Sequence, residues 1–152
     1  METPLIRHTI TLAYDYRIYT TRAVFSPANP LLAQVFTETA RRLPVKVVTC
    51  IDDGLIASRP ELPALVEDWF ARNPQVATLA RPPAILPGGE AGKNDWRHVE
   101  RIWELIRDGH ICRHSFVLAI GGGALLDLVG FGAATAHRGV KLIRLPTTGL
   151  AQ

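Results

Sequence analysis

The chain has 152 residues, of which 47% are hydrophobic and 20% charged, with a formal net charge of +3 and two cysteines. This composition is typical of one globular domain and excludes a disordered tail or a disulfide-framed mini-protein. No apolar run approaches the roughly 18 residues of a membrane span, and the basic residues form no stripe with interleaved aromatics, so we expect no membrane and no nucleic-acid partner.

The first third of the chain is predicted to contain a hairpin, a helix and a buried strand. The opening METPLIRHTI lacks the apolar core of a signal peptide, and we expect a cytoplasmic protein. Period-2 alternation in residues 8–13 and 17–24 predicts an N-terminal β-hairpin. Apolar residues at helical spacing from Leu32 predict a helix that Pro44 ends. The apolar run 45–51 predicts a strand buried on both faces.

Strands and helices alternate along the rest of the chain. Further strands are predicted at 76–80, 116–120 and 140–145, a loop or edge at 81–90, and helices over about 61–71, from an Asn94 or Asp95 cap to Gly109, and over about 124–136. This alternation implies βαβ units, and therefore an α/β fold with a mainly parallel, Rossmann-like sheet flanked by helices. In such sheets, ligands bind beyond the carboxyl ends of the strands.

The glycine-rich turn at residues 121–123 is the first candidate site. Three glycines leave the backbone bare, so a diphosphate can approach the N–H groups that begin the following helix. Asp127 follows in the first turns of that helix. The Rossmann fingerprint is incomplete, because Leu126 stands where its third glycine belongs. A tight strand–helix turn is the alternative, and this pattern alone does not separate the two.

Two loops with acidic residues are further candidates. In PGGEAGKND, Glu90 can accept from ribose hydroxyls and Lys93 can donate to a hydroxyl or phosphate. A solvated Glu–Lys pair is the alternative. Asp52 and Asp53 follow the strand predicted at 45–51, where an adenosine ribose lies in an open α/β sheet. An ordinary acidic turn is the alternative there.

The last candidate is the stretch after the helix predicted at 124–136. Arg138 stands at the helix end, where its guanidinium can complement the last carbonyl groups or clamp a phosphate. Thr147 and Thr148 follow the last strand, so two hydroxyl groups face the expected ligand crevice. A C-cap arginine and a polar turn are the alternatives. His137 has no second His or acid at metal-ligand spacing, which predicts no metal site here.

Together, these motifs resemble the 3-dehydroquinate synthase family of sugar phosphate cyclases. The family pattern is Gly-Gly-Gly, an Asp four residues on, Gly-Phe, small residues, Arg-Gly, a strand and Pro-Thr-Thr-x-Leu-Ala-Gln. Residues 121–152 read GGGALLDLVGFGAATAHRGVKLIRLPTTGLAQ. The upstream PGGEAGKND is similar to the family's Gly-Gly-Glu-x-x-Lys loop. The strong match covers about residues 87–152.

The resemblance implies that residues 1–152 form the NAD-binding N-terminal domain of a two-domain lyase. Family members, among them the 3-dehydroquinate synthase of the shikimate pathway to aromatic amino acids, convert a seven-carbon sugar or sugar-acid phosphate to a carbocycle. The steps are transient oxidation, phosphate elimination, re-reduction and aldol closure, with NAD acting catalytically. A divalent metal, zinc or cobalt, polarises the hydroxyl and carbonyl. The implied partners are the sugar phosphate and a second copy in a homodimer.

The resemblance also implies roles for individual residues. It implies adenosine-ribose contacts for Asp52, Glu90 and Lys93, pyrophosphate contacts for Gly122, Gly123 and Ala124, a place on the nicotinamide side for Asp127, and dinucleotide contacts for Thr147 and Thr148. Arg138 is implied to bind the substrate phosphate across a dimer interface. The family's metal ligands and catalytic lysines lie downstream of Ala-Gln, so we expect these 152 residues alone to bind NAD weakly or not at all and to lack turnover.

Alternatives remain open on the sequence alone. Leu126 and Gly149 depart from the usual family pattern, which leaves open a paralogous cyclase acting on another sugar phosphate. An iron-containing or glycerol dehydrogenase shares the fold and the Gly-Gly-Gly-x-x-x-Asp turn but usually follows the Asp with Ala-Lys, whereas Gly130-Phe131 and Arg138-Gly139 follow Asp127 here. A stand-alone nucleotide-binding module is the non-enzymatic alternative.

Overall fold

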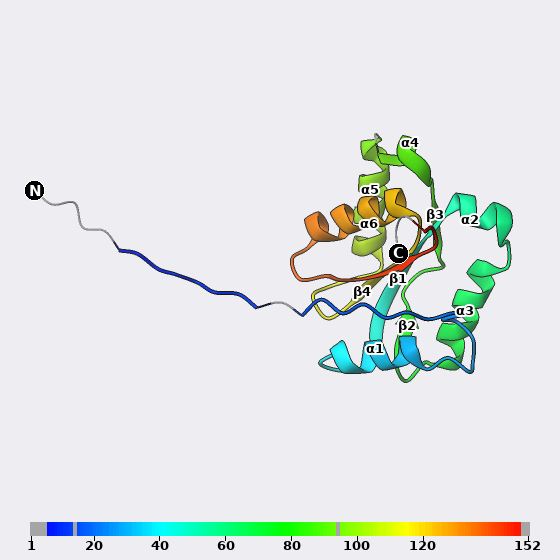
Figure 1. The fold of residues 1–152 in the computed structure, drawn as a ribbon, viewed down its shortest axis with the longest axis horizontal. Coiled ribbons are helices and arrows are strands. Elements are labelled where there is room, and N and C mark those ends of the chain that lie inside the picture. Colours follow the sequence, from blue (N-terminus) through cyan, green and yellow to red (C-terminus); the bar gives the residue numbers. More distant parts are fainter. Residues whose placement is uncertain (1–5, 14, 94, 150–152) are drawn as a thin grey trace, which may run out of the picture.

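A parallel sheet forms the centre of the computed structural model, which describes residues 6–13, 15–93 and 95–149, with only the backbone of Ala91 and Lys93 (Figure 1). Its strands are β1 Val45–Asp52, β2 Ala77–Leu79, β3 Ala84–Leu86, β4 Phe116–Gly121 and β5 Lys141–Pro146. Its helices are α1 Leu31–Thr39, α2 Asp53–Ser58, α3 Leu62–Arg72, α4 Gly89–Lys93, α5 Trp96–Asp108 and α6 Gly123–Ala136.

The strand order is β2-β1-β4-β5, and every pairing between them is parallel. The short strand β3 pairs with the last residues of β1, on the same side as β2. In chain order, the strands that follow β1 therefore lie first on one side of it, as β2 and β3, and then on its other side, as β4 and β5. This reversal makes the carboxyl ends of β1 and β4 the topological switch point, where open α/β sheets bind ligands. The predicted α/β fold with a parallel sheet is confirmed.

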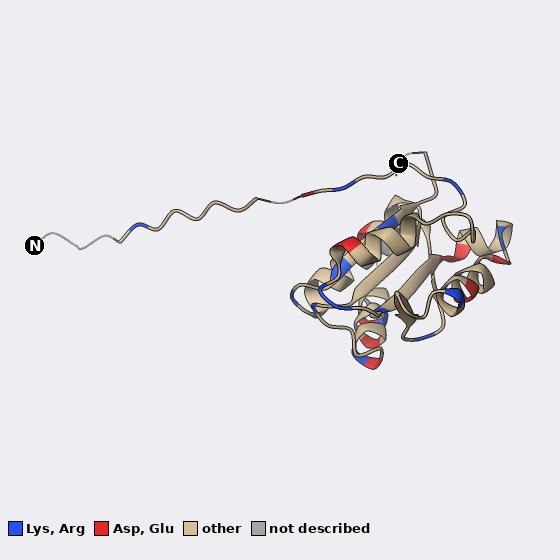
Figure 2. Ribbon diagram, turned by 90° about the horizontal axis from the view of Figure 1, so that it is seen from below, with Lys and Arg blue, Asp and Glu red and all other residues tan. Residues whose placement is uncertain are grey.

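Helices cover both faces of the sheet, which explains why β1 and β4 are nearly continuous apolar runs. On one face, α5 and α6 pack against side chains such as Val48, Cys50 and Val117. On the other, α1 and α3 pack against Val47 and Phe116, among others. Burial raises the pKa of the Cys50 thiol to about 12, so this cysteine is a neutral core residue. Charged residues are spread over the helices and loops (Figure 2).

Most predicted elements are present, with changed boundaries. The first helix ends at Thr39, well before Pro44. Asp52 caps α2 rather than entering a polar turn, because its carboxylate accepts from the Gly54 N–H at 2.9 Å. Residues 89–93, expected as loop, form α4. Asp95 caps α5 as predicted, by accepting from the Arg97 N–H at 3.0 Å.

The predicted N-terminal hairpin is wrong. Residues 6–13 and 15–22, which we call the N-terminal arm, have no strand partner and run along and away from the body (Figures 1 and 2). Alternating Thr, Ile and Tyr suit a strand, but a two-stranded hairpin by itself is at best marginally stable in water. The arm joins the body at Phe25, which is buried beside α3 and accepts a hydrogen bond from Arg72. Within the described residues, no helix is long and apolar enough to span a membrane.

Candidate functional site

The predicted site residues converge where β1 and β4 end side by side. Ile51 pairs with Ile120, so Asp52 at the end of β1 lies opposite Gly121 at the end of β4. The Asp52 carboxylate reaches across this gap, with Oδ2 3.4 Å from the Gly122 N–H. The first N–H groups of α6 therefore face the same crevice as an acidic side chain from the neighbouring strand.

Two adjacent carboxylates tie three segments of the chain together at this crevice. Asp52 Oδ1 accepts from Gly54 at the start of α2, and Asp53 Oδ1 accepts from the Gly88 N–H at 2.9 Å. The loop before α4 is thereby held against the end of β1. The sequence had marked the Asp52-Asp53 pair, but nothing in it indicated that Asp53 would bind the distant Gly88.

The glycines around the crevice fall into two groups, according to what a Cβ atom would meet. At Gly88 a Cβ would lie 2.2 Å from Asp52 Oδ1, and at Gly121 it would lie 2.8 Å from Asp52 Cβ. These two glycines are required by the protein's own packing. At Gly123 a Cβ would meet no atom of the described residues within 4 Å, although the residue begins a helix. Internal packing therefore explains Gly88 and Gly121 but leaves Gly123 unexplained.

The start of α6 supplies backbone donors next to that open space. Gly122 is the N-cap residue, with extended backbone (φ −78°, ψ 172°), and it has no side chain to cap the first turn. The first N–H groups of a helix have no intrahelical partner, and the helix dipole places partial positive charge there. A bare, electropositive turn with room in front of Gly123 fits the diphosphate of a dinucleotide, so the residues present fit NAD.

Thr147 and Thr148 approach the same turn from the end of β5. The Thr147 N–H donates to the Gly121 carbonyl at 3.0 Å. Thr148 Cγ2 lies 3.3 Å from the position that a Cβ on Gly122 would take. The polar stretch after β5 thus lines the crevice, as the position of these residues after a parallel strand predicted.

Glu90 and Lys93 lie on α4, which packs against α6. Glu90 is exposed and stands two residues after Gly88, the residue that binds Asp53. The structure therefore brings the PGGEAGKND loop to the mouth of the crevice. The side chain of Lys93 lies outside the described part of the structure.

Asp127 sits one turn into α6, with its side chain 62% exposed and Oδ1 3.9 Å from Nη1 of Arg144 on β5. Sequence reasoning missed Arg144, which was treated as one of many scattered basic residues. No local sequence pattern indicated its position: the contact appears only in the structure, where a Cβ on Gly130 of the same helix would stand 2.7 Å from Arg144 Nη2. The guanidinium thus covers the outer part of α6 between Gly130 and Asp127.

Arg138 is not brought to this crevice. It is exposed two residues after the end of α6, whereas Gly122 precedes the start of that helix. At about 1.5 Å per residue, the 14-residue helix separates the two by roughly 20 Å. Within the described residues, no group of three or more His, Cys, Asp or Glu side chains could hold a metal ion. The crevice thus gathers dinucleotide-binding candidates without a phosphate-binding arginine or a metal site.

Comparison with known proteins gives a consistent result. Residues 83–152 match the family model described as 3-dehydroquinate synthase N-terminal. The chain is 37% identical over 140 residues to the 3-dehydroquinate synthase of Paracoccus denitrificans, covering 92% of this chain and 34% of that protein. It is 36% identical over 97 residues to that of Jannaschia sp., covering 64% and 26%. The chain therefore spans only about a quarter to a third of the length of these curated relatives.

Two solved structures share the fold. One is 2-epi-5-epi-valiolone synthase from Streptomyces hygroscopicus with NAD⁺ and Zn²⁺ bound, with a TM-score of 0.70, 24% identity, and coverage of 93% of this chain and 35% of that one. The other is 2-deoxy-scyllo-inosose synthase complexed with carbaglucose-6-phosphate, NAD⁺ and Co²⁺, with a TM-score of 0.60, 24% identity, and coverage of 80% and 30%. At this low identity, the structural likeness shows a shared fold alone.

Proposed function

By its sequence this chain belongs with the N-terminal part of the 3-dehydroquinate synthase family, and we propose that it is the NAD-binding domain of a sugar phosphate cyclase. The observation that carries the proposal is the open space in front of Gly123, at the uncapped start of α6. The relatives named above are 3-dehydroquinate synthases, which supports a cyclase over a dehydrogenase. The proposed setting is the cytoplasm, where the two free cysteines remain reduced.

The roles proposed for the crevice residues follow from their positions. The N–H groups of Gly122, Gly123 and Ala124 hold the pyrophosphate, since they begin α6 and carry its positive dipole end. Asp52 accepts from the adenosine ribose hydroxyls with the oxygen that is 3.4 Å from Gly122, because its other oxygen is held by Gly54. In neither role does the bound nucleotide have to displace a side chain from the turn at residues 121–123.

Residues around Asp52 and the start of α6 complete the proposed dinucleotide site. Glu90 lies beside the ribose from α4, the helix that also carries Lys93, and Thr147 and Thr148 line the opposite wall from the end of β5. Asp127 stands one helical turn beyond the pyrophosphate, on the side proposed for the nicotinamide. When bound, NAD supplies a reversible hydride acceptor for a ring hydroxyl of the substrate.

The activity proposed for the whole enzyme is conversion of a seven-carbon sugar or sugar-acid phosphate to a carbocycle, with phosphate as the leaving group. The described residues offer no set of side chains that fits a metal ion. Arg138 lies far from the crevice of its own chain, so its proposed role as the phosphate ligand requires a second copy in a homodimer. The guanidinium would then reach the substrate bound to the partner.

Nucleotide titration followed by amide NMR tests the proposal and detects even millimolar binding. We expect NAD⁺ to shift the amide signals of residues 121–124 and of Asp52. A Gly123→Ala variant should lose these shifts while remaining folded, because its methyl group occupies the space proposed for the diphosphate. Gly130→Ala, on the outer part of the same helix, is the matched control and should keep them. NAD⁺-induced shifts that fall away from residues 121–124 and Asp52, or that persist unchanged in Gly123→Ala, would overturn the proposal.

A further inference from the structure

We propose that the outer edge of β5 accepts residues 8–13 from a second copy of this chain, so that two protomers exchange N-terminal arms as added strands. This exchange specifies the homodimer proposed above and is independent of NAD binding.

The edge of β5 has a defined length and direction. β5 ends the strand order, and within the described residues it has no partner beyond β4. The N–H groups of Lys141 and Thr147 donate toward β4, to Ser115 and Gly121, so the alternate residues direct theirs outward. Leu142 and Arg144 therefore offer backbone groups at the free edge. Pro146 has no N–H and ends that ladder, as prolines do at sheet edges.

The N-terminal arm carries the complementary features of a missing strand. Ile10 and Leu12 are 80% and 68% exposed, and in an extended chain they lie on one side, with Thr9 and Thr11 on the other. Ile6 and Ile18 are also about 80% exposed. A run of large apolar side chains left in water at alternate positions is typical of a surface that another molecule covers.

The two faces of the arm match the two sides of β5. Ile143 and Leu145 contribute to the core cluster shared with α1 and α3, and both are only partly buried. An added strand that directs Ile10 and Leu12 to this side extends that apolar layer past the edge. Its threonines then fall on the other side, beside the exposed guanidinium of Arg144. Six residues span about 20 Å as a strand, which is the length of β5.

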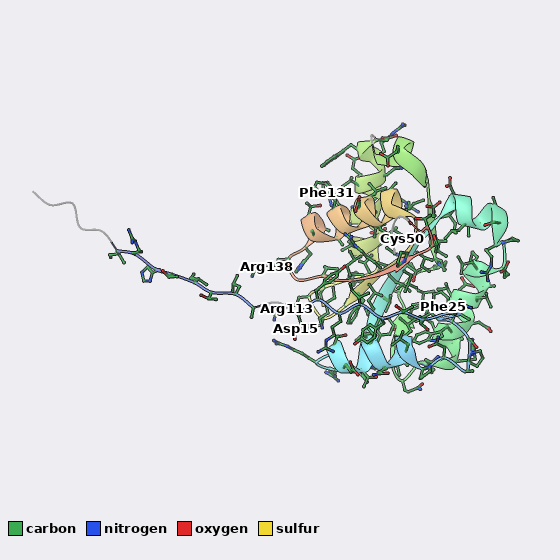
Figure 3. All side chains as sticks on the ribbon, viewed as in Figure 1. Asp15, Phe25, Cys50, Arg113, Phe131 and Arg138 are labelled. Carbon is green, nitrogen blue, oxygen red and sulfur yellow. The ribbon has the colours of Figure 1, made fainter. Side chains whose placement is uncertain are left out.

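The path of the arm favours a second copy over the same chain. Arg17 pairs with Glu38 at 3.1 Å, and the neighbouring Thr39 carbonyl accepts from Lys141, the first residue of β5. The arm therefore passes the amino end of β5 and then leaves the body near Asp15 (Figures 1 and 3). Returning to its own edge requires a reversal within Tyr-Asp-Tyr at 14–16, which contains no glycine or asparagine for a tight hairpin turn. An arm that continues outward reaches a partner without such a reversal. When each chain gives its arm to the other, the two chains form a closed two-fold dimer.

Disulfide trapping between differently tagged chains tests the exchange directly. Thr11→Cys in one chain and Arg144→Cys in the other, both in a Cys112→Ser background, are mixed and oxidised. A bond between these chains can form only in trans, and we expect its yield to exceed, by about tenfold, that with the control Glu100→Cys on α5. Equal yields with both partners overturn the proposal. So does a bond that forms only within one chain carrying both Thr11→Cys and Arg144→Cys, because the arm then returns to its own edge.

Sedimentation equilibrium supplies an independent measurement across the micromolar range. The unmodified chain should dimerise, and Leu12→Lys should raise the dimer dissociation constant at least about tenfold by placing a charge in the apolar layer. Thr9→Gln, on the polar side of the arm beside the Arg144 guanidinium, is the control and should change it much less. A monomeric unmodified chain, or dimerisation unaffected by Leu12→Lys, overturns the proposal. NAD-induced shifts at 121–124 are measured in a separate experiment. The failure of one proposal therefore does not decide the other.

Discussion

Asp52 is the residue on which the candidate site depends most at the scale of single side chains. One carboxylate caps α2 through Gly54, approaches the Gly122 N–H, and fills the space that Gly88 and Gly121 leave by lacking a Cβ. The Gly-rich motifs at 88–89 and 121–123 are therefore partly a consequence of where this acid lies. Of the glycines 121–123, Gly123 is the one in front of which the described residues leave free space.

This distinction predicts different outcomes for two glycine substitutions. Gly88→Ala should lower the free energy of unfolding by about 1–3 kcal/mol, because the new methyl group collides with the Asp52 carboxylate and forces the loop to move. Gly123→Ala should leave it unchanged or raise it by up to about 1 kcal/mol, since alanine favours the helix and meets no atom. Urea unfolding of both variants measures the difference. Equal destabilisation by the two substitutions would contradict this account of the turn.

At the scale of elements, the close approach of α5 and α6 depends on one glycine in the middle of α6. A Cβ on Gly132 would lie 2.7 Å from Ile102 Cγ2 and 2.9 Å from Ile102 Cβ. Ile102 is fully buried, so neither helix has room to shift its partner aside. The small residues of α6 thus set the distance between the helices that cover this face of the sheet.

Gly132→Ala should therefore destabilise the fold by about 1–3 kcal/mol through overpacking. Gly130→Ala is the matched control in the same helix: its closest contact is the far end of the flexible Arg144 side chain, which can move. That variant should be neutral or slightly stabilising, because alanine replaces glycine within a helix. The midpoints of urea unfolding compare them, and a Gly130→Ala midpoint at or below that of Gly132→Ala would refute the packing argument.

Elements with strong local signals could be predicted from the sequence, whereas elements decided by distant contacts could not. The apolar runs at β1 and β4 and the Asp95 cap of α5 are encoded within a few residues, and they occur as expected. The N-terminal arm has equally good strand residues, yet a strand needs a neighbour, and none is provided within the described chain. For the site, the positions of Asp52, Gly122 and Thr147 directly after parallel strands predicted that all three lie at the ligand-binding edge of the sheet. The hydrogen bond from the Gly88 N–H to Asp53 joins segments that are distant in sequence, so no local sequence pattern indicated it.

At the scale of the whole molecule, the structure consists of a well-packed body and an arm joined at Phe25. Both faces of the sheet are covered, so ligand chemistry is confined to the rim where the strands end. The arm, by contrast, exposes most of its side chains, and its described contacts with the body include the Arg17–Glu38 pair and hydrogen bonds from Asn29 to Thr21 and Arg22. The two parts should respond differently to a protease.

Brief trypsin treatment should cut first after the exposed Arg7, Arg17 and Arg22, leaving a body that begins near Ala23. Most other basic residues lie on helices or strands of the body, where the backbone is held in place. Mass spectrometry of the early products identifies the cut sites. Early cuts within the body would contradict this division. The cut at Arg7 should slow as protein concentration rises, because exchanged arms are held in a partner.

The pairing of β1 with β4 has a consequence for how the chain is made. Val47 on β1 pairs with Phe116 on β4. Because these residues are far apart in sequence, β1 leaves the ribosome long before β4 has been synthesised. Parallel pairing across such a separation requires a large loop to close, which is slow compared with local helix formation. During that interval an apolar run that is finally buried on both faces stays open to wrong partners. We therefore expect the newborn chain to be a client for chaperones that bind extended apolar segments until residue 121 has emerged.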